Sequence, residues 1–290
     1  MTDTAEVPET RGNRGPTDDG PLADIGVALE AFARGEILVV VDDEDRENEG
    51  DLIMAAEHVT PEKIAFFLHH TSGFICAPIT TERAAELDLR PMVEQNTESM
   101  RTAFLVSVDY RHGTTTGISS FDRAATVLAL VDPTTRPGDL ARPGHILPLE
   151  AREGGVLKRA GHTEATVDLA RMAGLYPAGI LCEIVDDSKM GMARQPELRR
   201  FAREHDLHMI SIADLIRYRR RTEKLVRRVA EARIPTGWGD FNAFVYENVL
   251  TMCTDAPFEP FAVERNGGFE GFDIDLAQAI ADNLDRDLDV

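Results

Sequence analysis

The chain has 290 residues, of which 43% are hydrophobic and 28% charged, so it can bury a sizeable core and cannot be disordered throughout. Its 51 acidic and 31 basic residues give a formal net charge of −20, which argues against a nucleic-acid-binding protein. Three cysteines are too few for a disulfide framework, and neither a membrane span nor a secretion signal is evident, so we expect a cytoplasmic protein without membrane contact.

The first half of the chain alternates between predicted helices and strands. Residues 1–22 are rich in Pro, Gly and charge, and we expect a disordered leader. Apolar spacing predicts a helix from Ile25 to Phe32, and the apolar run Ile37–Val41 predicts a buried strand. A helix should follow Thr60, with Thr60 as its N-cap and proline in its first turn. GFICAPI and AFLVSVDY are predicted strands.

The second half continues the alternation. GHTEATVDLARMAG predicts a helix that Thr163 opens and Gly174 closes, and AGILCEIV predicts a strand. A helix over PELRRFAREHD, a strand over HMISI and one long helix over ADLIRYRRRTEKLVRRVAEAR should follow. Arg217–Arg233 carries eight basic residues in seventeen, which we interpret as the solvated face of that helix. The alternation predicts a single α/β (mixed α+β) domain over residues 23–220.

The segment DDEDRENEGD, from Asp42 to Asp51, places seven carboxylates and Arg46 directly after a predicted buried strand. An acidic solvated loop is one interpretation. A site for a divalent metal and a phosphosugar is the other, because α/β folds place ligands at the carboxyl ends of strands. The single arginine within the acidic run favours the second.

The segment KRAGHTEA, from Lys158 to Ala165, combines basic side chains with a predicted helix start, where backbone N–H groups attract anions. Arg159 can donate two hydrogen bonds to phosphate, Thr163 can cap the helix or contact a ligand, and His162 is placed to bind a metal. An ordinary capped helix with exposed basic residues is the alternative.

Three further residues are candidates for chemistry. His145 follows a predicted Pro-Gly turn and either reaches into a cleft or decorates the surface. Glu183 lies inside an apolar strand and either faces solvent or carries out acid–base work in a site. Cys76 is expected to be a small buried hydrophobic residue unless other evidence places it in a site.

Taken together, these segments resemble the 3,4-dihydroxy-2-butanone 4-phosphate synthase family, whose members act on D-ribulose 5-phosphate in riboflavin biosynthesis. The resemblance covers about two-thirds of the chain and rests on six segments that occur in the family's order: DDEDRENEGD, TSGFIC, TTGISSFDRA, RPGHILPL, GGVLKRAGHTEA and AGILCEI. It implies a lyase that uses Mg²⁺ or Mn²⁺, releases formate, and forms a homodimer with its active sites at the subunit boundary.

The resemblance also implies roles for individual residues. Glu47 and His162 fall on metal-binding positions, and His145 and Glu183 fall on positions essential for catalysis. The positions that contact substrate are Arg46, Glu47, Asp51, Cys76, Arg159, Ala160, Gly161, His162, Thr163 and Glu183.

The end of the chain changes character. Residues 221–250 should form a connecting helix followed by a truncated start of GTP cyclohydrolase II, which RRVAEARIPTGWGDFNAFVY resembles. That enzyme needs three closely spaced zinc cysteines, and only Cys253 lies beyond Cys182, so no zinc site is expected. Residues 251–290 resemble a fragment of an extracellular solute-binding protein. A bifunctional synthase–cyclohydrolase and a solute-binding protein are therefore the alternative functions.

Overall fold

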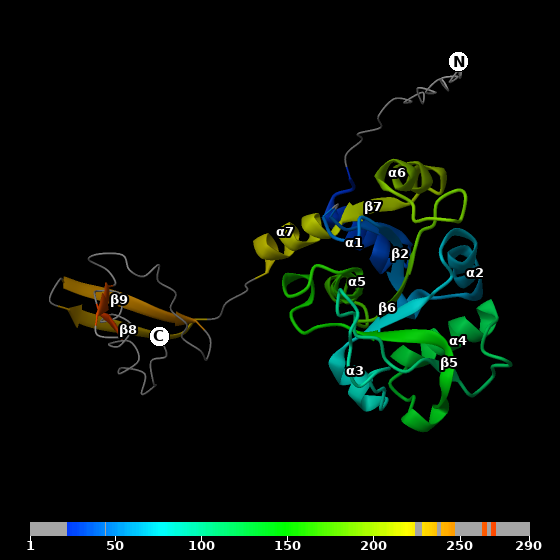
Figure 1. Cartoon of the computed structure of the whole chain (residues 1–290), viewed down its shortest axis with the longest axis horizontal. Helices are drawn as coiled ribbons and strands as arrows, with labels where there is room; N and C mark the ends of the chain where they lie inside the picture. The colour runs from blue at the N-terminus through cyan, green and yellow to red at the C-terminus, as the bar shows by residue number, and fades with distance from the viewer. Residues whose placement is uncertain are drawn as a thin grey trace, which may run out of the picture. The chain divides into compact units, whose positions relative to one another are not determined.

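The computed structural model describes residues 22–43, 45–223, 228–236, 239–246, 263–265 and 268–270. The chain divides into two compact units, and the boundary lies between Arg219 and Arg220. The first unit is a mixed seven-stranded sheet of order β4-β5-β3-β6-β2-β1-β7 with helices on both faces (Figure 1). The expected α/β class is confirmed.

Two neighbouring pairs of strands in this sheet are parallel, β1 with β7 and β3 with β5, and the others are antiparallel. The strands are β1 Leu38–Val41, β2 Gly50–Ala55, β3 Cys76–Ile79, β4 Val108–Tyr110, β5 Leu140–Glu150, β6 Gly179–Glu183 and β7 His208–Ser211. The helices are α1 Ile25–Ala33, α2 Pro61–His70, α3 Thr81–Glu86, α4 Ser120–Val131, α5 His162–Met172, α6 Gln195–Glu204 and α7 Ile212–Thr222. Short 3₁₀ turns are η1 Ala56–His58, η2 Pro137–Asp139 and η3 Gly155–Leu157.

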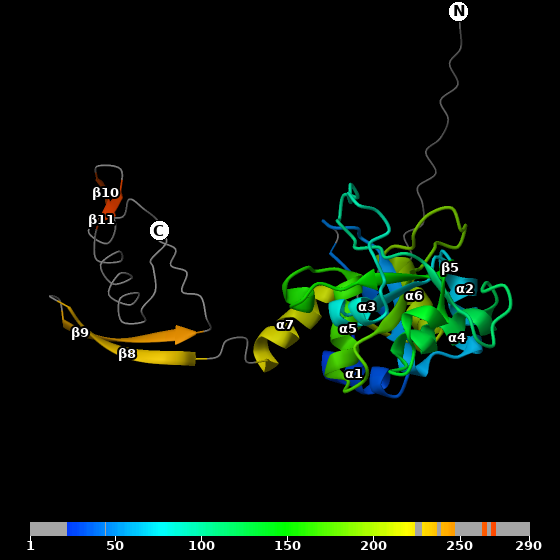
Figure 2. The same ribbon diagram turned by 90° about the horizontal axis from the view of Figure 1, so that it is seen from below.

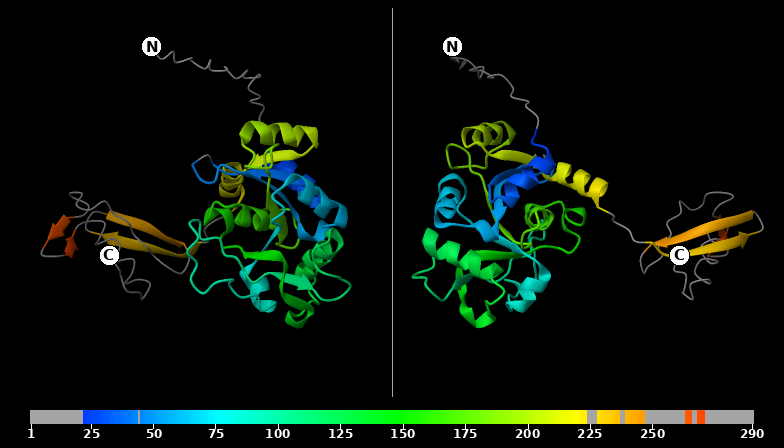
Figure 3. Two further views of the ribbon diagram at one scale, coloured as in Figure 1. Left: turned by 45° about the vertical axis from the view of Figure 1, so that its right-hand side comes forward. Right: turned by 180° about the vertical axis from the view of Figure 1, so that it is seen from behind.

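The core forms two layers, because successive side chains of a strand point to opposite faces of the sheet. On β1, Val39 and Val41 pack with α2, α4 and α6. Leu38 and Val40 point the other way and pack with α1, α5 and α7. All four residues of β1 are buried, which explains the unbroken apolar run in the sequence. Figures 2 and 3 show the helices on either side of the sheet from three further directions.

The predicted start of α2 is confirmed. The Thr60 side chain accepts a hydrogen bond from the backbone N–H of Lys63, and Pro61 occupies the first turn. The helix expected at Ile25 is also present, and the Asp24 carboxylate caps it by accepting from the Gly26 N–H at 2.8 Å.

The predicted start of α5 is wrong by two residues. The helix begins at His162, and Gly161, with extended backbone, is its N-cap. Thr163 is therefore not the cap but lies in the first turn, where it is buried. A β-carbon on Gly161 would lie 2.3 Å from the Arg159 guanidinium, so a larger residue there would force the Arg159 side chain to shift.

The long final helix and the connecting helix expected in 221–250 are also wrong. α7 ends at Thr222, and β8 (Arg228–Thr236) pairs with β9 (Gly239–Tyr246) as an antiparallel hairpin. A continued helix would bring basic residues three and four positions apart onto one face, where like charges destabilise it. Val263–Arg265 and Gly268–Glu270 form a second short pair, β10 and β11. Most of 251–290, with Cys253, and nearly all of the expected leader lie outside the described residues.

Three predictions in the middle of the chain need correction. The Pro-Gly turn before His145 is absent, because these residues belong to β5, whose pairing with β4 shifts register there. AFLVSVDY yields only the short strand β4, while Phe104 and Leu105 make isolated bridges. β2 begins inside the segment that we treated as an acidic loop, so Asp51 lies on a strand. Among the described helices, none combines the length and apolar character that crossing a bilayer requires.

Candidate functional site

The acidic loop between β1 and β2 is organised by Asp42. Its buried carboxylate accepts hydrogen bonds from the backbone N–H groups of Glu47 at 3.1 Å and Glu49 at 2.9 Å. Arg46 Nη1 lies 2.7 Å from carboxylate oxygens of both Asp42 and Glu47. The single arginine of the run therefore pairs with two of its carboxylates and holds the Glu47 side chain.

His162 lies against this loop from the start of α5. Its Nε2 is 3.1 Å from the carbonyl oxygen of Val40, and since a carbonyl only accepts, Nε2 carries the proton. The lone pair is then on Nδ1, which lies 3.9 Å from Glu47 Oε2. Burial lowers the pKa of His162 despite the nearby carboxylates, which favours the neutral ring that metal ligation requires.

Asp51 and Glu183 lie opposite each other on the paired strands β2 and β6. Asp51 is 2% exposed, and its Oδ1 has no hydrogen-bond partner among the described residues. Burial, and then the charges of Glu183 and neighbouring carboxylates, raise the pKa of Asp51 well above its ordinary value. The Glu183 carboxylate accepts a hydrogen bond from the Ser72 hydroxyl at 2.8 Å.

These groups form a candidate metal centre. One ligand atom each from Asp42, Glu47 and His162 lie within 4.8 Å of one another. Carboxylate oxygens and a neutral imidazole suit Mg²⁺ or Mn²⁺, and the unpartnered oxygen of Asp51 faces the same polar region, 3.9 Å from His162 Nε2. The residues present therefore fit a divalent cation. Sequence reasoning selected Glu47 and His162 but missed Asp42, whose position at the end of β1 was the available signal.

Arg159 lies beside this centre and is held by several acceptors. Its guanidinium donates to Glu164 Oε2 at 2.7 Å, to Thr102 Oγ1 at 2.9 Å and to the Met100 carbonyl oxygen at 3.3 Å. The start of α5 adds free backbone N–H groups, so an anion can be held here by a fixed arginine and a helix N-terminus.

One cavity, with about 470 Å³ of free space and open to solvent, joins the metal centre to Arg159. The candidate residues that line it are Arg46, Glu47, Asp51, Cys76, Arg159, His162, Thr163 and Glu183. Ala160 and Gly161 do not line it, although both lie between residues that do. Sequence reasoning missed Glu49, Thr102, Phe104, Leu149 and Leu181, which also line it.

Cys76 is 2% exposed, and burial raises the pKa of its thiol well above the ordinary value. The thiol is therefore protonated at neutral pH and is a poor nucleophile. Cys76 contributes a wall of the cavity rather than a reactive group.

His145 does not line this cavity. It lies on β5, where its backbone N–H and its ring Nδ1 contact the two carboxylate oxygens of Asp109 at 2.8 and 2.7 Å. The carboxylate holds the ring orientation and leaves Nε2 for another partner. A single chain thus brings Glu183 to the metal centre but does not bring His145 there.

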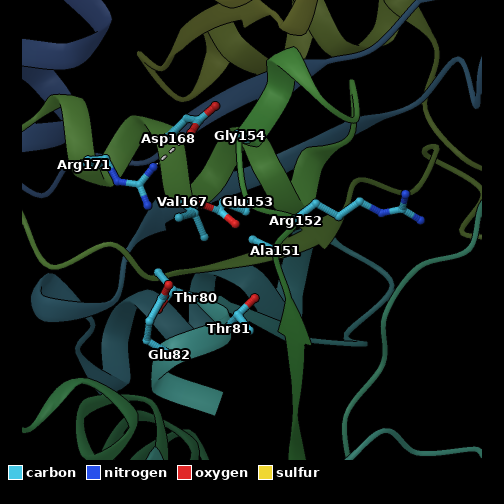
Figure 4. Close-up of a pocket in the computed structure, with 11 residues that line it drawn as sticks. Thr80, Thr81, Glu82, Ala151, Arg152, Glu153, Gly154, Val167, Asp168 and Arg171 are labelled. Atoms are coloured by element: carbon cyan, nitrogen blue, oxygen red, sulfur yellow. Dashed lines mark ion pairs between the residues drawn. The ribbon is translucent and has the colours of Figure 1, made fainter. Parts of the chain in front are cut away.

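A second cavity, with about 360 Å³ of free space, lies between α3, residues 151–155 and α5 (Figure 4). Its lining mixes acidic residues such as Glu82 and Glu153 with the basic residues Arg152 and Arg171. Arg171 is drawn toward the buried Asp168, 3.9 Å away. With charges of both signs and no metal-ligand cluster among the described residues there, this cavity has the weaker chemistry.

The fold and the site define an α/β protein with a candidate divalent-metal centre beside an arginine that could hold an anion. The model of the 3,4-dihydroxy-2-butanone 4-phosphate synthase family matches residues 27–218, and the chain belongs to that family. The resemblance seen in the sequence is therefore confirmed for the synthase.

Individual relatives agree with this assignment. Riboflavin biosynthesis protein RibBA of Aquifex aeolicus (strain VF5) is 55% identical over 226 residues, covering 77% of this chain and 55% of the relative. Monofunctional riboflavin biosynthesis protein RIBA 2, chloroplastic, of Arabidopsis thaliana is 53% identical over 250 residues, covering 86% of this chain and 52% of the relative. The chain thus spans about half the length of the curated relatives it matches.

A solved 3,4-dihydroxy-2-butanone 4-phosphate synthase in complex with two magnesium ions is 46% identical, with a TM-score of 0.67. The match covers 69% of this chain and 98% of that structure.

Proposed function

We propose that this chain converts D-ribulose 5-phosphate to 3,4-dihydroxy-2-butanone 4-phosphate and formate, with Mg²⁺ or Mn²⁺ as cofactor. The observation that carries the proposal is the meeting of Glu47, His162 and Arg159 around one cavity. Family membership and the magnesium complex of a solved relative support the same activity.

Each group has a task that its position suits. Arg159, with Thr163 and the N-terminus of α5, would hold the phosphate at one end of the substrate. Glu47 and His162 would hold the cation, which when bound polarises sugar oxygens and so acidifies neighbouring C–H and O–H groups. Both tasks fix the sugar phosphate in one orientation within the cavity.

Proton transfer falls to the carboxylates. The reaction requires enolisation and dehydration, so protons must be taken from carbon and given to oxygen. Glu183 lines the cavity, and so does Asp51, whose pKa is raised by burial and by neighbouring carboxylates, which favours the protonated carboxyl. His145 supplies the remaining acid–base group, with its ring already oriented by Asp109.

Formate release tests the proposal. The purified full chain with Mg²⁺ should produce formate from ribulose 5-phosphate, which a coupled formate dehydrogenase assay detects. EDTA should abolish the signal, and added Mg²⁺ or Mn²⁺ should restore it. Folded, metal-loaded protein that leaves ribulose 5-phosphate unchanged would overturn the proposed function.

A homodimer with a shared pocket is part of the proposal. His145 lies outside the cavity that its own chain forms, so a second copy would have to supply it. Gly117 lies against His145 Nδ1, and the neighbouring Ile118 and Phe121 are exposed, as is Phe74; Phe121 is 71% exposed. Arg123 ties their loops together by donating to the carbonyl oxygens of Gly73 and Ile118. An isologous contact over this patch would bury the exposed aromatic rings and create two equal pockets.

For residues 221–250, we propose a start of GTP cyclohydrolase II. The alignment with the monofunctional Arabidopsis relative, at 250 residues, is longer than the stretch that the family model matches. The solute-binding resemblance of 251–290 stays a prediction, and amino-acid binding by the purified protein would be its sign. A cytoplasmic location also stays a prediction, since the Arabidopsis relative is named chloroplastic.

A further inference from the structure

The turn Thr71–Phe74 before β3 belongs to TSGFIC, one of the six segments that carry the family resemblance. None of the side chains of this turn has a role in the mechanism above. Ser72 in this turn is separated from Glu183 by 111 residues, but the two are hydrogen-bonded. The Ser72 hydroxyl lies 2.8 Å from Glu183 Oε2, and the Ser72 backbone N–H donates to the Glu183 carbonyl oxygen at 2.9 Å. Ser72 therefore holds both the side-chain carboxylate and the backbone carbonyl of Glu183.

The direction of the hydroxyl proton follows from the other contacts of Ser72. The Phe74 backbone N–H donates to Ser72 Oγ at 3.2 Å and occupies one of its lone pairs. The carboxylate can only accept when ionised, so the hydroxyl donates toward Glu183. Cys182 Sγ lies 3.3 Å from Ser72 Oγ and makes a weaker contact with it. Burial raises the pKa of the Cys182 thiol to about 11, so this group bears no charge that would compete for the Ser72 hydroxyl.

The turn itself is built to hold this geometry. Thr71 Oγ1 donates to the Phe67 carbonyl oxygen at 2.6 Å and accepts from the Gly73 N–H at 3.2 Å. Gly73 has a φ of 77°, a conformation that other residues rarely adopt. Arg123 Nη1 donates to the Gly73 carbonyl oxygen at 3.2 Å from α4. Ser72 is thus fixed from several elements, as a positioning residue requires.

Glu183 needs such support. Among the described residues, the Glu183 side chain makes no ion pair, and Glu183 is the last residue of β6. We propose that Ser72 is a positioning residue, which holds one oxygen of the Glu183 carboxylate and so aims the side chain into the cavity for proton transfer. The inference rests on the proposed function, because it concerns the same site.

The test compares kcat and KM for formate release at saturating Mg²⁺ in full-length variants. Ser72→Ala should lower kcat by about 10-fold to 100-fold, the range for losing a hydrogen bond to a charged group, with KM nearly unchanged. Ser72→Thr keeps the hydroxyl and should retain most of the activity. Ser188→Ala removes a similar exposed serine–carboxylate bond, to Asp186, and should leave both constants as in the wild type.

A double-mutant cycle separates positioning from a general structural effect. Glu183→Asp shortens the side chain away from Ser72, so adding Ser72→Ala to it should lower kcat little further. If Ser72→Ala leaves kcat unchanged, or lowers it equally in both backgrounds, the inference is overturned.

A crystal structure of the Ser72→Ala variant gives a second readout, independent of activity. The Glu183 carboxylate should lose its single orientation there while the backbone of β6 stays in place. If the wild type releases no formate, the proposed function fails, and the crystal structure alone decides the positioning. A Glu183 carboxylate that keeps its position in the variant would then overturn the inference.

Discussion

Glu47 and His162 lie on different elements, and their side chains meet 3.9 Å apart in the structure. Loss of a residue that only supports a metal ligand typically costs about 10-fold to 100-fold in affinity or activity, so loss of a ligand itself should cost more. We therefore predict that Glu47→Gln and His162→Ala each remove most formate release. The loss should be most severe at low Mg²⁺, which activity measured across a Mg²⁺ titration checks.

Glu36→Gln is the matched control for this pair, because Glu36 makes an exposed ion pair with Arg34 on the surface. It should behave as the wild type at every Mg²⁺ concentration. Wild-type activity of either ligand variant at all concentrations would remove that residue from the metal centre.

Asp51 links the site to stability. Burial and neighbouring carboxylates raise the pKa of Asp51 in the folded protein, so the folded state binds its proton more tightly than the unfolded state does. Its contribution to stability is therefore greatest below the ordinary pKa of 3.8 and falls as pH rises through the raised value. In metal-free buffer, Asp51→Asn should raise Tm at pH 7 and leave it nearly unchanged at acidic pH.

A stabilisation of about 1 kcal/mol would appear as about 2–4 °C in Tm for a protein of this size. Asp187→Asn is the control, since Asp187 is exposed. A variant less stable than the wild type at pH 7 without metal would show that the Asp51 carboxylate is satisfied by a partner.

At the residue scale, the sequence selected candidate side chains that stand in local motifs, and the structure places them around one cavity. Short segments of unusual composition contain Glu47, Arg159 and His162, so the residue types and their order are enough to select these side chains as candidates. Ser72 and Asp109 act through partners 111 and 36 residues away, and only the pairing of strands brings each to its partner.

At the scale of elements, α7 is attached to α5 by a buried ion pair. Arg219 Nη1 lies 2.6 Å from Asp168 Oδ2 and also donates to the Gly154 carbonyl oxygen. Removing one partner of a buried pair typically costs about 3–5 kcal/mol when the other charge is left without compensation. Asp168 keeps Arg171 at 3.9 Å and the Val156 N–H at 2.8 Å, so we predict that Arg219→Met destabilises the protein by less than this amount at neutral pH, as measured by urea unfolding.

The pH dependence distinguishes this loss from simple loss of packing. Burial already raises the pKa of Asp168, and removing Arg219 should raise it further. The destabilisation should therefore shrink in acid, where Asp168 is protonated in both states, and grow as pH rises. Arg217→Met alters an exposed arginine of the same helix and should change stability little.

Element prediction succeeded where one local signal was strong. The apolar run of β1 predicts a strand that is buried on both faces, and the Thr-Pro pair predicts the capped start of α2. Each signal is contained in a few consecutive residues. Prediction failed at β5, where Pro143 and Gly144 suggested a turn. These residues lie within β5, between Ala141 and Ile146, which pair with neighbouring residues of β4 across a register shift. It failed again at β8, whose partner β9 supplies the stability that the local helix pattern lacks.

At the scale of the whole molecule, the cavity residues all precede the boundary between Arg219 and Arg220. We predict that a chain ending after Glu223, which keeps all of α7, releases formate at close to the wild-type rate. The measurement is kcat for the truncated and full-length proteins, with circular dichroism to show that both are folded. A folded but inactive truncation would assign the second unit a part in catalysis.

The last prediction concerns assembly. In a shared pocket, Glu47 comes from one subunit and His145 from the other, so inactive Glu47→Gln and His145→Ala proteins should complement each other after subunit exchange. Each mixed dimer then has one pocket with both lesions and one with neither. Random exchange at equal amounts makes half the dimers mixed, so about a quarter of wild-type activity should return.

Mixing Glu47→Gln with His162→Ala provides the matched control. These two residues lie 3.9 Å apart within one chain, so every pocket of a mixed dimer keeps one lesion and no activity should return. Mass spectrometry confirms that exchange has occurred in both mixtures. If exchange is complete and the Glu47→Gln and His145→Ala mixture stays inactive, His145 must reach the cavity of its own chain by moving with β5, and the shared pocket is wrong.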